Sequence, residues 1–503
     1  MSKISIKKNI IANYIGQFYT MFIGIFMLPF YIKYLGAEAY GLVGFFTMIT
    51  SWLMLLDMGF SSALARETAK LKDKTDGLFE LKLTLRSVET MVSILSIIIF
   101  ISILFSAHWI SEYWLQVKLL EYETVENCII LMGLMISLRW YVSLYTGLVL
   151  GFEQQVWLNT YKIFISTIKF VGGLVLIIYI SDDIFHFFIY QGIVSIIELL
   201  ILNYKIYSNL PKSKFVFPSI KSIKKIAPFA LGLAYTSGVW IVFTQLDKLL
   251  LSHYISLDKY GYFALVVTLS AAILQFSSPI SQAILPRMTS LLSNNNEKGM
   301  LSLYKKGTQY ISIIIFSVVG IVSVYSYELL YAWTGDTQAS VWASPILSWY
   351  ALGNGVLAIL TFQYYLQYAH GNLKYHIKFN TYFPLIVLPI VFFAVNNYGA
   401  IGAGIAWFII QFVTFIIWPP YIHNKFAKGL HKDWLIKDIL PAFFTTLIFL
   451  FILNVIDINF QHYSRFELFS ILIGLGISLI ILNAIAYQNI RRKIINFIKE
   501  RNE

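Results

Sequence analysis

The sequence predicts an all-α polytopic membrane protein with about 14 transmembrane helices. Of its 503 residues, 58% are hydrophobic and only 13% are charged, and the mean hydropathy is +0.70. A soluble domain carries about 25% charged residues, so this chain does not have enough charge to cover several soluble cores. We expect two pseudo-repeated six-helix lobes around a central cavity, followed by two C-terminal helices.

Apolar runs between charged or turn-rich breaks define the candidate spans, because a helix needs about 20 residues to cross the hydrocarbon core. The runs are 10–32, 40–63, 87–107, 127–150, 159–180, 184–203, 228–250, 260–285, 308–330, 344–368, 379–395, 399–420, 439–457 and 467–488. Very short turns, SDD and NNYGA, join runs five to six and eleven to twelve, which predicts two tight hairpins. The first run is longer than the h-region of a cleaved signal peptide, so we expect a retained helix.

The distribution of basic residues predicts the orientation of the spans. The N-terminus, the even-to-odd connections and the C-terminal tail hold 30 of the 38 Lys and Arg residues. The opposite loops hold only Lys33, Lys118, Lys259 and Arg465. By the positive-inside rule both termini are cytoplasmic. The net charge of +12 therefore reflects topology and contact with anionic membrane lipid, and gives no reason to expect a nucleic-acid partner.

Several classes of function are disfavoured by missing motifs. The single cysteine, Cys128, excludes a disulfide framework and a thiolate zinc site. The sequence has no phosphate-binding loop ending in Gly-Lys and no His-Glu-x-x-His helix, which are typical of ATPase motors and zinc hydrolases. We expect no cofactor and no metal, and we do not expect an enzyme.

The two halves of the chain are related to each other. A basic segment, residues 204–228, carries six lysines and three prolines and is typical of a linker. Four matches recur in order at offsets of 220 or 221 residues: Tyr40-Gly41 with Tyr260-Gly261, Arg66 with Arg287, Gly151 with Gly371, and Asn159-Thr160-Tyr161 with Asn380-Thr381-Tyr382. We therefore expect an N-lobe at 1–204, a cytoplasmic linker at 205–227, a C-lobe at 228–422, and two helices with a basic tail at 423–503. Parallel repeats place a substrate site between the lobes near the midplane.

Three segments resemble the polysaccharide flippase family, typified by O-antigen flippases. Residues 28–67 contain a Leu-Gly-x-x-x-Tyr-Gly turn, then Asp57-x-Gly59, then Arg66. The stretches QLDKLLLSHYISLDKYGYFA (245–264) and YGAIGAGIAW (398–407) are similar to later segments of the family. The resemblance covers most of the chain up to about residue 421.

The resemblance implies a fold of the multidrug, oligosaccharidyl-lipid and polysaccharide exporter superfamily. It also implies a polyprenyl-diphosphate-linked glycan as substrate, a bacterial inner-membrane location and contact with glycan polymerase machinery. Many members have twelve helices, and the fourteen expected here look more like the peptidoglycan-precursor branch.

Arg139 lies near the middle of an apolar run, where a guanidinium costs roughly 2.5–3.5 kcal/mol. Small and polar residues share its helical face (Ser143, Thr146 and Gly147), which directs it toward the bundle interior. The next run has a polar stripe at helical spacing, made of Asn159, Lys162, Ser166, Lys169 and Gly173. Cations in a cavity suit a diphosphate, because Arg offers a planar fork and Lys a point charge.

The candidate substrate-binding residues are therefore Arg139, Lys162, Lys169, Asp57, Arg66, Arg287 and Lys248, and the candidate ion-coupling residues are Asp57 and Asp247. Each has a simpler interpretation beside it. Arg139 can bridge to Asp57, and Lys162 can snorkel to the headgroups, whereas Lys169 lies about ten residues into its run. Positive-inside bias alone accounts for arginines at cytoplasmic mouths, and adjacent residues 247 and 248 point about 100° apart.

Three functions remain open at this point. The first is a flippase that moves a lipid-linked oligosaccharide to the outer leaflet by alternating access, for O-antigen, capsule or a related polysaccharide. The second is a cation-coupled exporter of small drugs, which predicts an acid-rich cavity. The third is a membrane glycan polymerase or ligase, which favours a sizeable external loop, whereas residues 108–126 form the longest one here and contain one histidine.

The loop charges predict the outcome of reporter fusions. A reporter fused after Glu112 is expected to be active outside the membrane, and one fused after Lys212 inside, because only the second loop is rich in lysine. Paired alkaline phosphatase and fluorescent-protein fusions measure both. The opposite pattern of activity would invert the whole topology.

Overall fold

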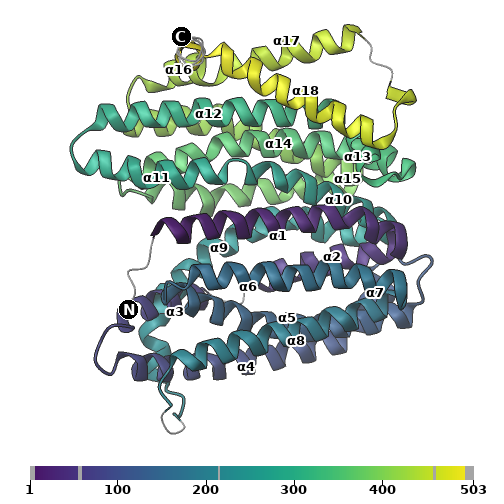
Figure 1. Ribbon diagram of the computed structural model, residues 1–503, viewed down its shortest axis with the longest axis vertical. Coiled ribbons are helices and arrows are strands. Elements are labelled where there is room, and N and C mark those ends of the chain that lie inside the picture. Colours follow the sequence, from purple (N-terminus) through teal and green to yellow (C-terminus); the bar gives the residue numbers. More distant parts are fainter. Residues whose placement is uncertain (1–5, 55–58, 213–215, 457–459, 493–503) are drawn as a thin grey trace, which may run out of the picture. The chain divides into compact units, whose positions relative to one another are not determined.

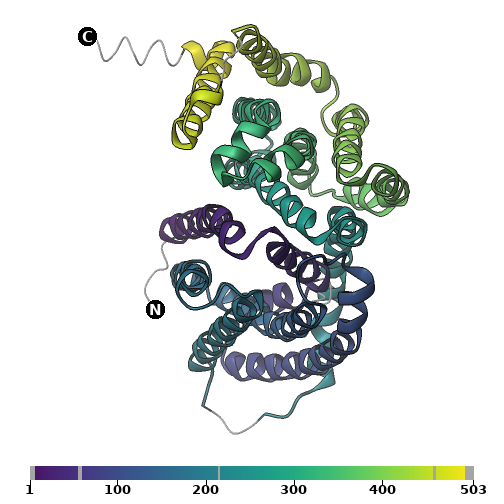
Figure 2. The same cartoon turned by 90° about the vertical axis from the view of Figure 1, so that its right-hand side faces the viewer.

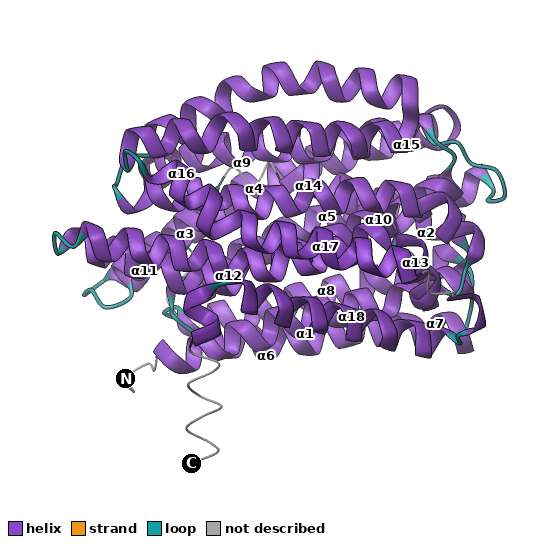
Figure 3. Ribbon diagram, turned by 90° about the horizontal axis from the view of Figure 1, so that it is seen from above, coloured by secondary structure: helices purple, strands orange, loops and turns teal. Residues whose placement is uncertain are grey.

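The computed structural model describes residues 6–54, 59–212, 216–456 and 460–492. Within these ranges the chain forms helices and loops, with an isolated bridge between Gln116 and Ser256 and no strand (Figure 3). The predicted all-α membrane class is therefore confirmed.

Twelve helices among the described residues are long and apolar enough to cross a membrane. One of them, α15 (Lys374–Phe426), contains both the eleventh and the twelfth predicted runs. The second predicted run lies across α2 (Ala37–Leu53) and α3 (Phe60–Leu71), with residues 55–58 outside the described part. The total of fourteen spans stays a prediction.

The chain divides into two compact units, Met1–Gly261 and Tyr262–Glu503. Unit 1 holds the following helices (Figure 1): α1 (Ile6–Leu35), α2, α3, α4 (Gly77–Trp109), the π-helix η2 (Ile110–Trp114), α5 (Tyr122–Gly151), α6 (Gln155–Thr167), the π-helix η3 (Ile168–Gly172), α7 (Gly173–Tyr179), α8 (Ile184–Asn209), α9 (Ile220–Tyr254) and the start of α10 (Leu257–Gln275). The predicted linker at 205–227 is helical at both ends, in α8 and α9.

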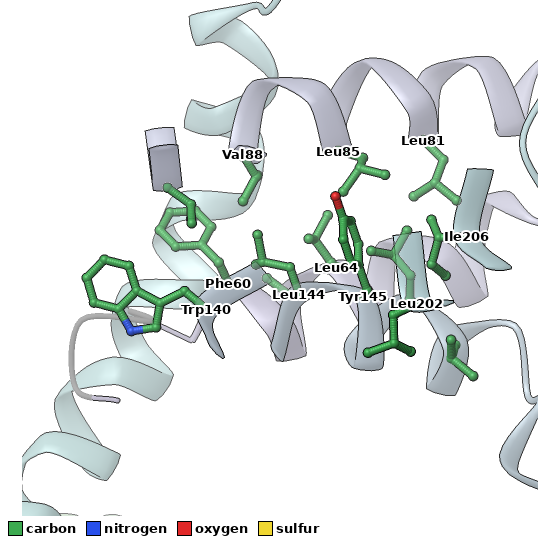
Figure 4. Close-up of a cluster of buried hydrophobic side chains, with 14 of the residues drawn as sticks. Phe60, Leu64, Leu81, Leu85, Val88, Trp140, Leu144, Tyr145, Leu202 and Ile206 are labelled. Carbon is green, nitrogen blue, oxygen red and sulfur yellow. The ribbon is translucent and has the colours of Figure 1, made fainter. Parts of the chain in front are cut away.

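A buried apolar cluster joins α3, α4, α5 and α8 in unit 1 (Figure 4). Its members recur every three or four residues, which places them on one face of each helix. The labelled side chains are Phe60, Leu64, Leu81, Leu85, Val88, Trp140, Leu144, Tyr145, Leu202 and Ile206. This cluster fixes α5, and with it the helix that carries Arg139.

The repeated Tyr-Gly pairs meet inside unit 1. A methyl group on Gly41 would overlap the carbonyl oxygen of Leu257, and one on Gly261 would overlap the carbonyl of Ala37. The backbones of α2 and α10 therefore approach each other as closely as two glycines permit. The spacing of the repeat thus corresponds to a contact between the starts of two helices.

The longest predicted external loop is tied down by Glu38. This buried carboxylate accepts hydrogen bonds from the backbone nitrogens of Lys118 (2.5 Å) and Leu119 (2.8 Å). Trp114 donates to Ser252 at 3.0 Å, on the last turn of α9. These contacts tie the loop to α2 and α9.

Unit 2 contains the rest of α10 and the following helices, several of them seen end-on in Figure 2: α11 (Ser278–Ser293), α12 (Glu297–Val324), α13 (Ser326–Thr334), α14 (Thr337–Ala369), α15, α16 (Leu430–Trp434), the π-helix η4 (Leu435–Ile439), α17 (Leu440–Ile456), the short η5 (Phe460–His462) and α18 (Arg465–Ala486). Its largest apolar cluster joins α12, α14 and α15 around Phe362, Tyr304 and Ile315.

The chain reverses within α15 at Gly399, which has φ 57° and ψ −140°. A Cβ atom on Gly402 would lie 3.0 Å from the carbonyl carbon of Ala394. Eight residues of continuous helix would separate these positions by about 12 Å, so two helical segments fold back on each other here. The predicted hairpin at NNYGA is present.

The two C-terminal helices pack on α12 through a buried amide. Asn483 of α18 donates to the hydroxyl oxygens of Ser317 on α12 (2.8 Å) and Thr446 on α17 (3.0 Å). Tyr487 donates to the backbone carbonyl of Asp438 at 2.8 Å. These bonds are strong in an apolar interior and fix the register of the pair against unit 2.

The Gly41 contact predicts an overpacking effect. Gly41→Ala is expected to destabilise the protein by about 1–3 kcal/mol, because the added methyl meets the Leu257 carbonyl. Gly474→Ala is the matched control, since nothing lies within 4 Å of a Cβ at that helical glycine. Thermal unfolding of both variants in detergent measures the difference, and equal melting of the two would contradict the close approach.

Candidate functional site

A π turn at η3 interrupts the sixth helical segment of unit 1. A π turn leaves backbone carbonyls without their usual partners four residues on, and such turns are frequent at functional sites. Side chains of α1 and α8 take three of these carbonyls: Tyr190 donates to Ile168 (2.7 Å), Gln191 to Lys169 (3.0 Å) and Tyr31 to Phe170 (2.8 Å). The turn is therefore held from two sides.

Two glycines make room for this arrangement. A Cβ atom on Gly172 would collide with the hydroxyl of Tyr190, and one on Gly173 would lie 3.0 Å from the hydroxyl of Tyr31. The regular stripe predicted from Asn159 to Gly173 is thus shifted by the π turn, which helical spacing alone does not show.

The ammonium group of Lys169 pairs with the carboxylate of Glu198 from α8. Their side chains are 16% and 15% exposed, so the pair is largely withdrawn from solvent. Glu198 also lies within electrostatic range of Lys162, whose side chain is exposed. A single carboxylate thus faces both predicted lysines.

Arg139 lies 17 residues after the start of α5 and 12 before its end, well inside a spanning helix. Its Nε is buried and has no hydrogen-bond partner, and none of the ion pairs formed by the described residues includes it. The guanidinium carbon is 5.9 Å from the centre of the Phe46 ring, and its charge lies within electrostatic range of Lys169. Arg139 is therefore a cation inside the helix bundle without a described counter-ion.

The face of α5 that carries Arg139 packs inward, as its small residues predict. The hydroxyls of Ser143 and Ser61 are 2.7 Å apart, and a Cβ on Gly147 would overlap the carbonyl of Ser61. Next to Arg139, Trp140 donates to the carbonyl of Leu53 at 3.1 Å. These contacts hold the arginine toward α2 and α3 and away from lipid.

Amide side chains connect α1 with α6 on the same side of unit 1. Asn13 donates to Gln155 at 2.8 Å, and Asn159 donates to Asn13 at 2.6 Å. Gly16 lets the two helices approach, because a Cβ there would collide with Asn159. The polar faces predicted for these helices therefore face each other.

Arg139, Lys162, Lys169 and Glu198 together carry three positive charges and one negative charge, a net charge of +2. Charges of one sign in a low-dielectric interior attract an oppositely charged ligand strongly, because water screens them little. The chemistry of this group suits a polyanion such as a diphosphate.

The other candidate residues are not part of this group in the described structure. Asp57 falls outside the described residues, so its bridge to Arg139 stays a prediction. Arg66 is exposed on α3, with its guanidinium 4.4 Å from the Phe229 ring centre. Lys248 donates to Asp247 at 3.0 Å, so these neighbours pair despite their adjacent positions. Arg287 is exposed on α11 in unit 2.

Glu198 was not predicted from the sequence, although its carboxylate is the counter-ion of Lys169. The sequence feature that could have revealed it is that Glu198 is the one carboxylate in the apolar run 184–203. Glu89 on α4, which accepts hydrogen bonds from Tyr145 and Tyr207, both at 2.7 Å, was also not predicted. These two tyrosines line a pocket of about 440 Å³, but its polar groups largely satisfy one another. That pattern is typical of a structural network.

Metal coordination is not indicated in the described ranges, which contain no group of three or more His, Cys, Asp or Glu side chains placed to hold an ion.

Solved membrane transporters share this fold. An inward-facing multidrug resistance MATE family transporter of the MOP superfamily matches 83% of this chain and 98% of its own, with a TM-score of 0.60 at 14% identity. A MOP superfamily transporter from Pyrococcus furiosus matches 84% of this chain and 95% of its own, with a TM-score of 0.55 at 14% identity. The class of the protein is thus a multi-pass membrane protein with the MOP transporter fold.

The family follows from the sequence. Residues 6–292, more than half of the chain, match the model of the polysaccharide biosynthesis protein family, and the chain belongs to that family. A putative O-antigen transporter from Shigella flexneri is 21% identical over 411 residues, which cover 81% of this chain and 95% of that protein.

The Lys169–Glu198 pair predicts a charge-dependent effect on stability. Glu198→Gln is expected to destabilise the protein by roughly 3 kcal/mol, because it leaves an ammonium without its counter-ion in a largely buried position. Lys169→Gln together with Glu198→Gln is expected to recover most of the loss. Melting temperatures of the purified variants test this, and a single variant that melts like the wild type would refute the pairing.

Proposed function

We propose that the protein is a flippase for polyprenyl-diphosphate-linked oligosaccharides in a bacterial inner membrane. It moves its substrate from the cytoplasmic to the outer leaflet by alternating access, for O-antigen, capsule or a related surface polysaccharide. Three findings support the proposal: membership of a polysaccharide biosynthesis family, similarity to a putative O-antigen transporter, and the MOP transporter fold. Both termini are cytoplasmic in this scheme.

The observation that carries the proposal is the guanidinium of Arg139. It lies inside a spanning helix, its Nε is buried without a hydrogen bond, and the described residues give it no ion pair. A charge retained at such depth is costly and is usually tied to a substrate pathway. A diphosphate supplies the missing anion, and the planar fork of Arg matches phosphate oxygens in a bidentate manner.

In this scheme the residues around Arg139 bind different parts of the substrate. Lys162 is exposed and offers a second charge to the phosphates, whereas Lys169 is held by Glu198. When an anion binds, Lys169 gains a second partner without moving far. The amides of Asn13 and Asn159 can exchange their mutual hydrogen bond for hydroxyls of the attached sugars. The polyprenyl tail stays in the surrounding lipid.

The membrane potential favours outward movement of this substrate. An inside-negative potential contributes about 2.3 kcal/mol per negative charge per 100 mV. Proton or sodium coupling would need a carboxylate that is not already neutralised. Asp247 is paired with Lys248, and Asp57 stays the other coupling candidate.

A second candidate function is a cation-coupled exporter of small molecules, because the fold is shared with multidrug transporters. The net charge of +2 around Arg139 disfavours it, since cationic drugs would be repelled from the site. Substrate polarity separates the two functions: the flippase binds a diphosphate, and the exporter binds a lipophilic cation.

Arg139→Ala is expected to abolish or sharply reduce surface glycan while the protein still accumulates in the membrane. Loss of a charge-assisted contact to a dianion costs about 1.5–3 kcal/mol, or roughly tenfold to a hundredfold in affinity. Arg139→Lys is expected to retain part of the function, because the charge remains while the fork is lost. Glycan display and membrane abundance are measured side by side.

Two controls separate binding from a structural role. Arg492→Ala removes an exposed arginine outside the site and is expected to leave display unchanged. If Arg139 instead bridges to Asp57, Arg139→Ala lowers abundance, and adding Asp57→Asn restores it. Normal display in Arg139→Ala at normal abundance would end the phosphate-contact proposal.

A further inference from the structure

Unit 2 contains a pocket of about 700 Å³ whose lining includes none of the candidate site residues of unit 1. The first three turns of α12 form one wall, η4 and the start of α17 a second, and the segment after α18 a third. The packing of the C-terminal helices on α12 through Asn483 brings these walls together.

Four lysines give the lining most of its charge. Lys298, Lys305 and Lys306 are spaced by seven and eight residues, which places them on one face of α12. Lys437 adds a fourth charge from η4, and Asp438 is the one carboxylate among the lining residues, which leaves a net charge of +3 (four minus one).

Two of the four lysines have no acidic partner among the described residues. Asp438 is fully buried; its Oδ1 accepts from Gln309 at 2.7 Å, and its Oδ2 is 4.0 Å from the ammonium of Lys305. Lys437 pairs with Asp433 at 3.0 Å. Lys298 and Lys306 are exposed, and no acidic side chain in the described ranges pairs with either of them.

The remaining lining is part polar (Ser302, Gln309, Tyr487, Gln488 and Asn489) and part apolar, and the pocket lies where candidate spanning helices end. Leu301, Leu430, Ile436, Pro441 and Ala486 contribute its hydrocarbon surface. The helix α12 is a candidate span that begins at Glu297, and Lys298 and Lys306 lie in its first three turns, before the apolar run that starts at residue 308. A basic rim beside an apolar wall at this depth matches a molecule with a phosphate and a hydrocarbon portion.

We propose that this pocket binds an anionic glycerophospholipid of the leaflet that meets the lysine-rich loops. The phosphodiester lies between Lys298 and Lys306, and the first part of an acyl chain lies along Ile436 and Pro441. Basic pockets between spanning helices on the cytoplasmic side are known sites for anionic headgroups. The occupant is a resident lipid that ties the C-terminal helices to α12, and the site is independent of the proposed flippase activity.

Lipid binding to the purified full-length protein tests the proposal. Native mass spectrometry compares phosphatidylglycerol with phosphatidylcholine, and phosphatidylglycerol is expected to bind more tightly. Lys298→Gln with Lys306→Gln is expected to weaken phosphatidylglycerol binding about 10- to 30-fold, and phosphatidylcholine binding little. These lysines are chosen because they have no acidic partner to leave behind.

The matched control removes the same charge elsewhere. Lys221→Gln with Lys224→Gln changes two exposed lysines at the start of α9 and is expected to leave binding unchanged. An equal loss in both double variants would overturn the proposal, because surface charge alone would then explain the affinity.

Two further experiments test whether the lipid binds in this pocket. Ser302→Trp, a neutral substitution on the lining of the pocket, is expected to weaken phosphatidylglycerol binding as strongly as the double lysine variant does. Unchanged binding in Ser302→Trp would overturn the assignment to this pocket. Inorganic phosphate at millimolar concentration is expected not to displace the lipid, and full displacement would identify a free-anion site instead.

Discussion

The polar interior of unit 1 depends on the π turn at η3. Its carbonyls are held by Tyr190, Gln191 and Tyr31, and this arrangement sets the position of Lys169 against Glu198. Within a bilayer every backbone and charged group needs an internal partner, because lipid supplies none. The turn meets that requirement for the backbone, and the ion pair meets it for one of the cations. Arg139, whose Nε is buried, has no such partner among the described residues.

Sequence patterns predicted several features of the fold and the site. Mean hydropathy and run length predicted the membrane class, and the small residues beside Arg139 predicted its inward direction. The NNYGA turn predicted the reversal at Gly399. The 220-residue repeat corresponds to a glycine contact between Gly41 and the start of α10. The inward face of α5 and the reversal at Gly399 follow from local spacing, because each depends on one helix or one turn, whereas the glycine contact was found only through the repeat.

Features that arise from contacts between distant segments could not be predicted in the same way. Helical spacing assumes a regular helix, so it missed the π turn, which is stabilised by side chains from α1 and α8. Glu198 is an isolated carboxylate in its run, and only packing brings it to Lys169. The pocket in unit 2 needs three segments, spread over residues 298–489, to come together. The roles of Asp57, Arg66 and Arg287 stay predictions.

In the proposed function, the cations of unit 1 bind a lipid-linked diphosphate. The most direct measurement is the affinity of purified protein for farnesyl diphosphate, with farnesyl monophosphate as comparator, in the wild type and in a variant without the Arg139 guanidinium. We expect the wild type to bind the diphosphate more tightly than the monophosphate. The variant is expected to lose about tenfold or more in affinity for the diphosphate at an unchanged melting temperature. Equal affinity of the two proteins for the diphosphate would contradict the proposal.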